Sequence, residues 1–350
     1  MGHGKLKKFA ENETFRCLLQ PDAASVLDKR DGSRALVLRD HPVKGRWNAD
    51  FFAVPQPIVL ELGCGKGDYT IALSRRRPDW NCLGVDIKGA RLWKGAKYAT
   101  EQQLPNVAFL RTRIEFIEAF FAPGEVSEIW LTFSDPQLRS ENSRLTSPLF
   151  LERYRKFLAP GGIVHLKTDS RFLHEYTLAV LRANNLEVLA CSTDIYNHHR
   201  FLEGDTSNSA WGSWRSSERP AEAVSEGLIG REPQGDNRGA APPSTKSRGW
   251  PEVLEGIPST DLSDRGVDAC PVDWSIVTGV QTFYEGMFLE MGLPITYLAF
   301  RIDREGEYVH PVDFDEEYWR EQEGPRRTFS HQPAKKPGSA AQARNGEGRG

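Results

Sequence analysis

The sequence has no long hydrophobic run and few cysteines. No stretch approaches the roughly 18 consecutive apolar residues of a membrane-spanning helix. The five cysteines are an odd number without a C-x-x-C pair, so we expect reduced thiols in a cytoplasmic protein. The first residues have no apolar core behind their lysines, which argues against a secretory signal. We therefore expect no membrane association.

The chain also lacks an excess of positive charge. Its 45 Lys and Arg are outweighed by 48 Asp and Glu, which leaves a net charge of -3. This balance excludes a wholly basic nucleic-acid coat protein but permits a local basic face. The eight histidines show no metal-ligand spacing, so we expect no metal.

Composition divides the chain into four regions. Residues 1–50 form a basic N-terminal segment, and residues 324–350 form a flexible C-terminal tail. Residues 206–272 are rich in Gly, Pro, Ser and Thr and have no apolar period, which predicts a disordered insertion. The remaining residues, 51–205 and 273–312, are expected to form one domain.

Short apolar runs alternate with helix-length segments in this domain. Such alternation predicts the α/β class, with a doubly wound, seven-stranded, mostly parallel Rossmann-like sheet. The last two strands are expected to pair antiparallel. The expected strands are 57–62, 81–87, 107–110, 128–133, 162–167, 186–191 and 294–302.

A glycine loop follows the first strand of the domain. Its sequence is Glu61-Leu62-Gly63-Cys64-Gly65-Lys66-Gly67, which fails the G-x-G-x-x-G spacing of a dinucleotide site and disfavours a dehydrogenase. The pattern acid-x-G-x-G-x-G is similar to the first motif of class I S-adenosylmethionine-dependent methyltransferases. A carboxylate at Glu61 would complement the positive charge of that cofactor. The alternative interpretation is a plain glycine turn.

Three further acids follow predicted strands. Asp86, at the end of the second strand, is placed to accept both hydroxyls of a ribose. Asp135 follows the fourth strand, and Asp169 follows the fifth. Ligands of doubly wound sheets bind beyond the carboxyl ends of the strands, so we expect these carboxylates to face one crevice. The alternative for Asp135 is a turn-initiating Asp before Pro136.

The motifs together resemble a known family. The F-x-D-P of Phe133–Pro136, the L-K-T-D that ends at Asp169 and the T-x-x-E of Thr282–Glu285 are similar to motifs of the tRNA (guanine-7-)-methyltransferases. The segments KLKKFAENETF and RLTSPLFLERYRKFLAPGG resemble the form of this family in Bacteroidetes-like bacteria. The resemblance covers roughly residues 4–205 and 273–302.

The resemblance implies a class I methyltransferase that methylates nitrogen 7 of a guanine in the variable loop of tRNA. S-adenosylmethionine would be the cofactor, tRNA the partner, and Asp135 the catalytic carboxylate beside the methyl group. The implied cofactor-binding residues are Glu61, Gly63, Gly65, Gly67, Asp86 and Asp135. The implied tRNA-binding residues are Arg139, Asp169, Thr282 and Glu285.

The chain departs from the family pattern around Asp135. Ser134 replaces the usual Pro, Gln137 replaces the usual Trp, and the basic run that follows is thinned to Arg139, Arg144 and their neighbours. Arg113 stands where the family places an acid that contacts adenine, so the resemblance implies no residue for that contact.

Two other interpretations stay open. One is a class I methyltransferase that acts on another RNA or on a small molecule, and the other is a non-catalytic relative that binds cofactor and RNA. For the tRNA enzyme we expect phosphate contacts that weaken with salt. The candidate side chains are Lys5, Lys7, Lys8, Arg139 and Arg144.

Overall fold

The computed structural model of the chain describes residues 3–28, 37–196 and 272–323. The tail predicted for residues 324–350 lies outside these residues, as does the insertion predicted for 206–272 except for Val272, which is buried. Within the described residues, no helix has the length and apolar character needed to cross a membrane.

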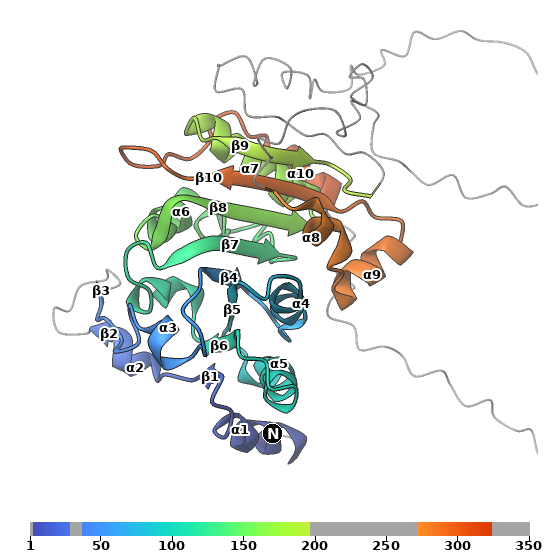
Figure 1. Cartoon of the computed structure of the whole chain (residues 1–350). Helices are drawn as coiled ribbons and strands as arrows, with labels where there is room; N and C mark the ends of the chain where they lie inside the picture. Colours follow the sequence, from blue (N-terminus) through green and yellow to red (C-terminus); the bar gives the residue numbers. More distant parts are fainter. Residues whose placement is uncertain (1–2, 29–36, 197–271, 324–350) are drawn as a thin grey trace, which may run out of the picture.

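An eight-stranded sheet forms the centre of the protein (Figure 1), in the order β1-β6-β5-β4-β7-β8-β10-β9. All seven predicted runs form strands of this sheet, which confirms the predicted fold class. The last pair, β9 and β10, is antiparallel as predicted, and β10 also pairs antiparallel with β8. The bounds of these seven strands are β4 (Ile58–Leu62), β5 (Asn81–Asp86), β6 (Val107–Arg111), β7 (Val126–Thr132), β8 (Leu158–Thr168), β9 (Val188–Ser192) and β10 (Thr296–Arg301).

The eighth strand comes from the N-terminal segment. β1 (Leu18–Leu19) pairs in parallel with β6 at the edge of the sheet, and α1 (His3–Asn12) packs against α5. The amide of Asn12 donates a buried hydrogen bond of 2.9 Å to the carbonyl of Gly89. The rest of the segment forms α2 (Ala23–Val26), α3 (Trp47–Asp50) and a small hairpin of β2 (Leu27–Asp28) and β3 (Val37–Leu38).

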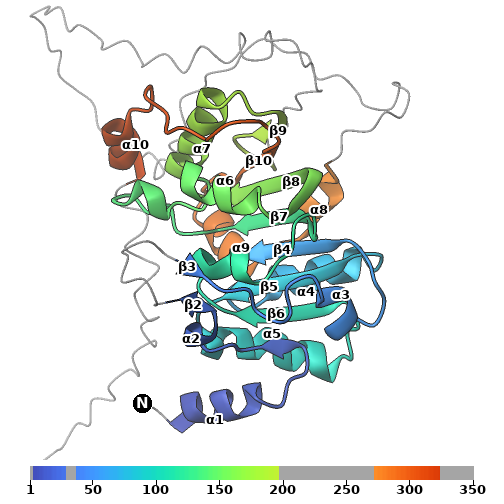
Figure 2. The ribbon, with the colours of Figure 1, turned by 90° about the vertical axis from the view of Figure 1, so that its left-hand side faces the viewer.

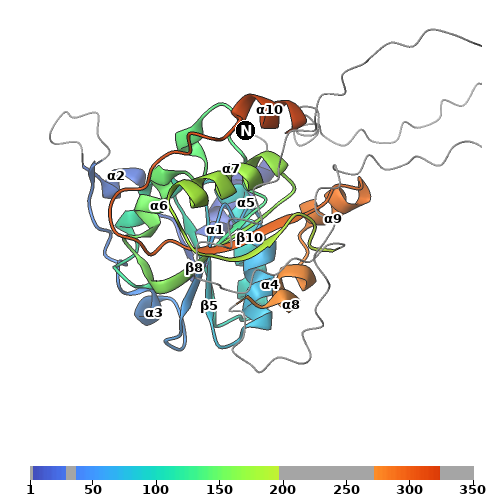
Figure 3. The ribbon, with the colours of Figure 1, turned by 90° about the horizontal axis from the view of Figure 1, so that it is seen from above.

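Helices cover both faces of the sheet, as seen from above in Figure 3. One face of the sheet carries α4, α5, α8 and α9, which lie next to the candidate site described below. The opposite face carries α3, η1, α6 and α7, and α10 packs against α7. The bounds of these helices are α4 (Asp68–Arg76), α5 (Gly89–Glu101), η1 (Ile114–Ala119), α6 (Pro148–Tyr154), α7 (Arg171–Ala183), α8 (Trp274–Gly279), α9 (Phe283–Glu290) and α10 (Glu316–Glu323).

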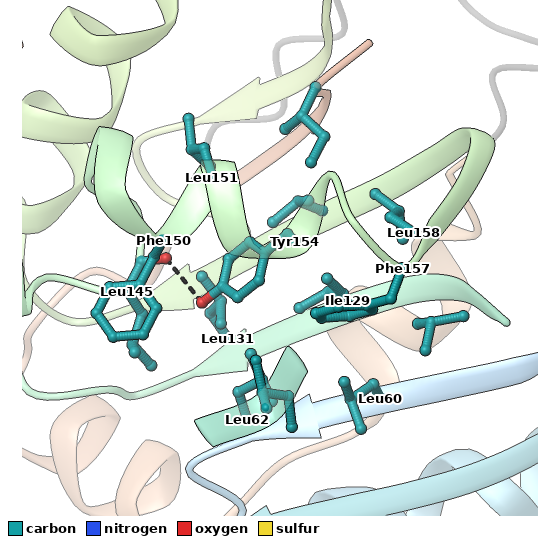
Figure 4. Packing of buried hydrophobic residues seen from close by; sticks show 14 of the residues in the cluster. Leu60, Leu62, Ile129, Leu131, Leu145, Phe150, Leu151, Tyr154, Phe157 and Leu158 are labelled. Carbon is teal, nitrogen blue, oxygen red and sulfur yellow. Dashed lines mark hydrogen bonds between the residues drawn. The ribbon is translucent and has the colours of Figure 1, made fainter. Parts of the chain in front are cut away.

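The larger core lies between the sheet and the second group of helices. Alternate residues of β4, Leu60 and Leu62, point into it because successive side chains of a strand face opposite sides. Figure 4 shows Tyr154 of α6 above them, with its hydroxyl donating to the carbonyl of Leu145 at 2.9 Å. The same alternation turns the carboxylate of Glu61 toward the other face, where α4 lies.

Candidate active site

The glycine loop turns sharply between β4 and α4. Gly63, Gly65 and Gly67 have φ angles of 81°, 59° and 77°, a region that glycine adopts without steric cost. A Cβ at Gly63 or Gly65 would meet no atom within 4 Å, so these two glycines border open space. A Cβ at Gly67 would lie 2.5 Å from Cε1 of Phe109. The first two glycines thus leave room for a ligand, and the third allows close packing.

Glu61 lies beneath this loop, with 2% of its surface exposed. Its Oε1 accepts a hydrogen bond from the Thr132 hydroxyl at 2.6 Å. Its Oε2 accepts from the Thr70 N–H at 2.8 Å and from the Thr70 hydroxyl. Burial raises the pKa of the carboxyl group, and these hydrogen bonds oppose the rise. Glu61 therefore joins β4, α4 and β7 under the loop, and its direct contact with a cofactor stays a prediction.

Asp86 connects the same loop to the start of α5. Its Oδ2 accepts from the N–H of Gly65 at 3.0 Å, and its Oδ1 accepts from the N–H of Lys88 at 2.6 Å. Each carboxylate oxygen keeps a second lone pair for a ligand hydroxyl. The structure thus brings Glu61, the glycine loop and Asp86 together at one edge of the sheet.

Asp135 is exposed and lies in the loop after β7, next to the glycine loop because β7 pairs with β4. Its Oδ1 accepts a hydrogen bond of 3.0 Å from the N–H of Gln137. The turn predicted before Pro136 is therefore present, and it orients the carboxylate. Phe133 and Gln137 have positive φ angles of 50° and 48° on either side of Asp135. Such backbone costs of order 1–3 kcal/mol per residue and persists only where surrounding contacts impose it.

Asp169 follows β8, the strand on the other side of β7, and is 8% exposed. It stands just before α7, whose N-cap Ser170 accepts a hydrogen bond from the N–H of Leu173 at 3.1 Å. Thr132 and Lys167 are paired in the β7–β8 register, so Asp135 and Asp169 leave the sheet on adjacent strands at the same edge. The two acids thus share one edge of the sheet, and a crevice between them stays a prediction.

Thr282 and Glu285 form a capping box at the start of α9, which is the structural role of the T-x-x-E pattern. Glu285 is fully buried, and its Oε1 lies 2.7 Å from Nζ of Lys167 and 2.7 Å from the hydroxyl of Tyr196. Burial lowers the pKa of Lys167, and Glu285 opposes that shift. The carboxylate of Glu285 contacts Lys167 and Tyr196 of the protein itself. Its contact with tRNA stays a prediction.

The residues predicted to contact tRNA phosphates lie in different environments. Arg139 is exposed, as a phosphate contact requires. The expectation for Arg144 is wrong, because its side chain is fully buried and its Nη2 lies 2.9 Å from Oε1 of Glu316. Lys7 and Lys8 lie on the docked helix α1, where Lys7 is exposed and Lys8 lies over the ring of Trp93 at 4.5 Å.

Sequence reasoning missed the partners that shape the site. Thr70 and Thr132, the partners of Glu61, belong to no sequence motif. Lys167, the partner of Glu285, lies within the L-K-T-D motif, but the motif alone predicted no role for it. The hydroxyl oxygen of Ser134, beside Asp135, is buried and has no hydrogen-bond partner among the described residues. The described part of the chain holds no group of three or more His, Cys, Asp or Glu side chains suited to a metal ion.

A mostly parallel sheet with an acid-x-G-x-G-x-G loop, an acid after the next strand and an Asp-Pro loop at the same edge defines a class I methyltransferase. A family model described as "Putative methyltransferase" matches residues 55–205. The chain belongs to the tRNA (guanine-N(7)-)-methyltransferase family, which confirms the resemblance found in the sequence.

Three relatives with that name support the assignment. The protein of Christiangramia forsetii is 39% identical over 300 residues, which cover 85% of this chain and 97% of that protein. The protein of Bacteroides thetaiotaomicron is 49% identical over 56% of this chain and 74% of its own length. The protein of Porphyromonas gingivalis is 54% identical over 44% of this chain and 64% of its own length.

Proposed function

We propose that this chain transfers the methyl group of S-adenosylmethionine to nitrogen 7 of a guanine in the variable loop of tRNA. One observation carries the proposal: a relative named for this activity matches 85% of the chain at 39% identity. The carboxylates expected for this chemistry lie near the ends of adjacent strands at one edge of the sheet, which supports it further.

S-adenosylmethionine, when bound, supplies a methyl group on a positively charged sulfur. The open space over Gly63 and Gly65 and the unpartnered hydroxyl of Ser134 fit a polar ligand at this edge. The remaining lone pairs of Asp86 suit the two ribose hydroxyls. Glu61 holds the loop from below and leaves its upper side free.

Asp135 positions the guanine and stabilises the charge that develops on it. Nitrogen 7 has a lone pair and no proton, so no general base is needed to form the nucleophile. The task of the protein is to position the base and to stabilise the positive charge that develops on the purine ring. The Asp135 carboxylate is exposed at this edge of the sheet and is oriented by Gln137, which suits it to accept hydrogen bonds from the guanine N–H groups. Asp169 provides a second acceptor on the neighbouring strand.

The tRNA is held by residues around this crevice. Arg139 provides an exposed charge for a backbone phosphate, next to the Asp135 loop. Thr282 and Glu285 fix the start of α9 beside the end of β8, so they present this segment to the substrate. The enzyme acts in the cytoplasm. None of the four cysteines among the described residues is part of a disulfide.

The proposal is tested with purified protein, methyl-labelled S-adenosylmethionine and an unmodified tRNA transcript. Nucleoside analysis is expected to find 7-methylguanosine in the variable loop. A transcript with adenine in place of the target guanine serves as the matched control and is expected to stay unmethylated. Label in ribosomal RNA but not in tRNA would favour the alternative of another RNA substrate. Cofactor binding without transfer to any RNA would favour a non-catalytic relative.

A further inference from the structure

The C-terminal helix α10 contacts the loop that carries Asp135 and the first turn of α7, the helix that follows Asp169. It lies outside the residues matched by the family model, which end at 205. Figure 2 shows α10 beside α7, and the two helices are in contact. α7 begins two residues after Asp169, and the loop that contains Asp135 lies between β7 and α6.

The first contact runs from Glu316 through Arg144 to the Asp135 loop. The buried guanidinium of Arg144 lies over the rings of Phe172 and Tyr176, at 4.7 and 4.3 Å from their centroids. Its Nη2 pairs with Glu316 at 2.9 Å, and its Nε donates to the carbonyl of Gln137 at 3.4 Å. Glu316 is thus the nearest counter-charge of a fully buried cation that holds this loop.

A second arginine strengthens the same connection. Arg320 of α10 donates a hydrogen bond to Glu316, and its Nε donates to the carbonyl of Leu138 at 3.2 Å. Two consecutive carbonyls of the Asp135 loop are therefore held by guanidinium groups that share Glu316 as their partner.

Gln137 connects this clamp to the catalytic carboxylate. The residue has a positive φ of 48°, which surrounding contacts must maintain. Arg144 holds its carbonyl, while its N–H donates to Oδ1 of Asp135 at 3.0 Å. A change in the position of Arg144 is therefore transmitted to Asp135 through the backbone of a single residue, Gln137.

The second contact lies at the Asp169 side. Glu323, 3% exposed, accepts a hydrogen bond of 3.3 Å from the N–H of Phe172 in the first turn of α7. The ring of Phe314, just before α10, packs edge-on against Phe172 and Tyr176 at 5.5 and 5.4 Å. The segment around α10 thus connects the Asp135 loop to the start of α7, the helix that follows Asp169.

We propose that Glu316 is a positioning residue for methyl transfer, which acts through Arg144 and Gln137 to hold the Asp135 carboxylate in its reactive orientation. The inference rests on the proposed function for the identity of the substrate. It does not require Glu316 to touch the tRNA or the cofactor. A helix that merely covered the core would stabilise the protein without changing the rate of the folded enzyme.

The test compares Glu316→Gln with Glu317→Gln, an exposed neighbour that loses the same charge from the same helix. We expect Glu316→Gln to lower kcat about tenfold or more, because small misplacements of catalytic groups slow positioned reactions strongly. The KM for tRNA and the affinity for S-adenosylmethionine are expected to stay near their original values. Arg144→Lys is expected to give a similar loss, and the double variant is expected to lose little more than either single variant. A wild-type kcat in folded Glu316→Gln overturns the proposal.

Amide hydrogen exchange separates this inference from the proposed function. We expect faster exchange in residues 133–140 of Glu316→Gln, and unchanged exchange in Glu317→Gln, in the full-length chain without substrate. If the wild-type chain does not methylate tRNA, the proposed function fails, and the exchange still shows whether Glu316 holds the loop. Unchanged exchange in this segment overturns the inference even where the enzyme is active.

Discussion

Nζ of Lys167 and Oε1 of Glu285 lie 2.7 Å apart, and neither side chain is exposed to solvent. Lys167 also donates to the carbonyls of Val277 and Val280 at 2.7 and 2.9 Å. A single buried ammonium group therefore attaches α8 and α9 to β8, the strand that Asp169 follows. Two motifs that are 118 positions apart in the sequence meet in this ion pair.

Glu285→Gln is expected to destabilise the protein by about 3–5 kcal/mol, because it leaves the buried charge of Lys167 without its counter-ion. Replacing both residues, as in Lys167→Met with Glu285→Gln, is expected to cost less than the sum of the single changes. Urea unfolding measures the free energy of unfolding of Glu285→Gln, Lys167→Met and the double variant. Glu290→Gln, an exposed change on the same helix, is the control. Additive costs for the two single changes would disprove the coupling.

The stability contribution of Glu61 is expected to depend on pH. Burial raises its folded-state pKa above the ordinary 4.5, so the folded state binds more protons than the unfolded state between these two pKa values. The wild type therefore loses stability as the pH rises through this window, and Glu61→Gln does not. The unfolding free energy of Glu61→Gln minus that of the wild type should increase from pH 4 to pH 7, as measured by urea unfolding. A difference that stays constant or decreases would contradict the raised pKa.

Asp135→Asn is expected to slow methyl transfer while S-adenosylmethionine still binds. Loss of a charge-assisted hydrogen bond is worth about 1.5–3 kcal/mol, which corresponds to a rate roughly 10- to 150-fold lower. Single-turnover kinetics on a tRNA transcript measure the rate, and calorimetry measures cofactor binding. Asp313→Asn, another exposed aspartate, is expected to leave both unchanged. A near-normal single-turnover rate for Asp135→Asn would rule out its catalytic role.

Gly63→Ala is expected to reduce cofactor affinity, whereas Gly67→Ala is expected to reduce stability. Alanine at position 63 extends into open space at the cofactor loop, so the affinity for S-adenosylmethionine should fall while the fold is retained. Alanine at position 67 collides with Phe109, so thermal stability should fall more strongly. Gly124→Ala is the control, because that glycine also has a positive φ and open space but lies away from the site. Equal cofactor affinity of Gly63→Ala and Gly124→Ala would exclude a ligand over Gly63.

The sheet could be predicted because its strands are continuous apolar runs, each long enough to recognise. β1 was missed because two residues, Leu18 and Leu19, show no period, and its pairing with β6 is fixed only by the docking of the N-terminal segment. The α10 segment was missed because its sequence is mostly charged and aromatic. Both elements are positioned by tertiary contacts.

The loops of the site could be located from sequence, but the surroundings of each side chain could not. Glu61 and Asp86 lie at the ends of recognisable strands, and Asp135 and Asp169 follow such strands, so the common edge of the four acids follows from the parallel order. Nothing local indicates that Glu61 and Glu285 are buried, since their partners Thr132 and Lys167 are distant in sequence. The sequence predicted a phosphate contact for Arg144. That prediction failed because Arg144 is buried against Phe172 and Tyr176 of α7, a packing contact that no local pattern indicates.

We propose that the edge of the sheet beyond β4, β5, β7 and β8 presents nitrogen 7 of a tRNA guanine to a methyl donor. The most direct measurement compares two otherwise identical tRNA transcripts, one with guanine and one with 7-deazaguanine at the target position of the variable loop. We predict that methyl label from S-adenosylmethionine enters only the guanine transcript and is recovered as 7-methylguanosine. Equal incorporation into the 7-deazaguanine transcript would contradict the claim.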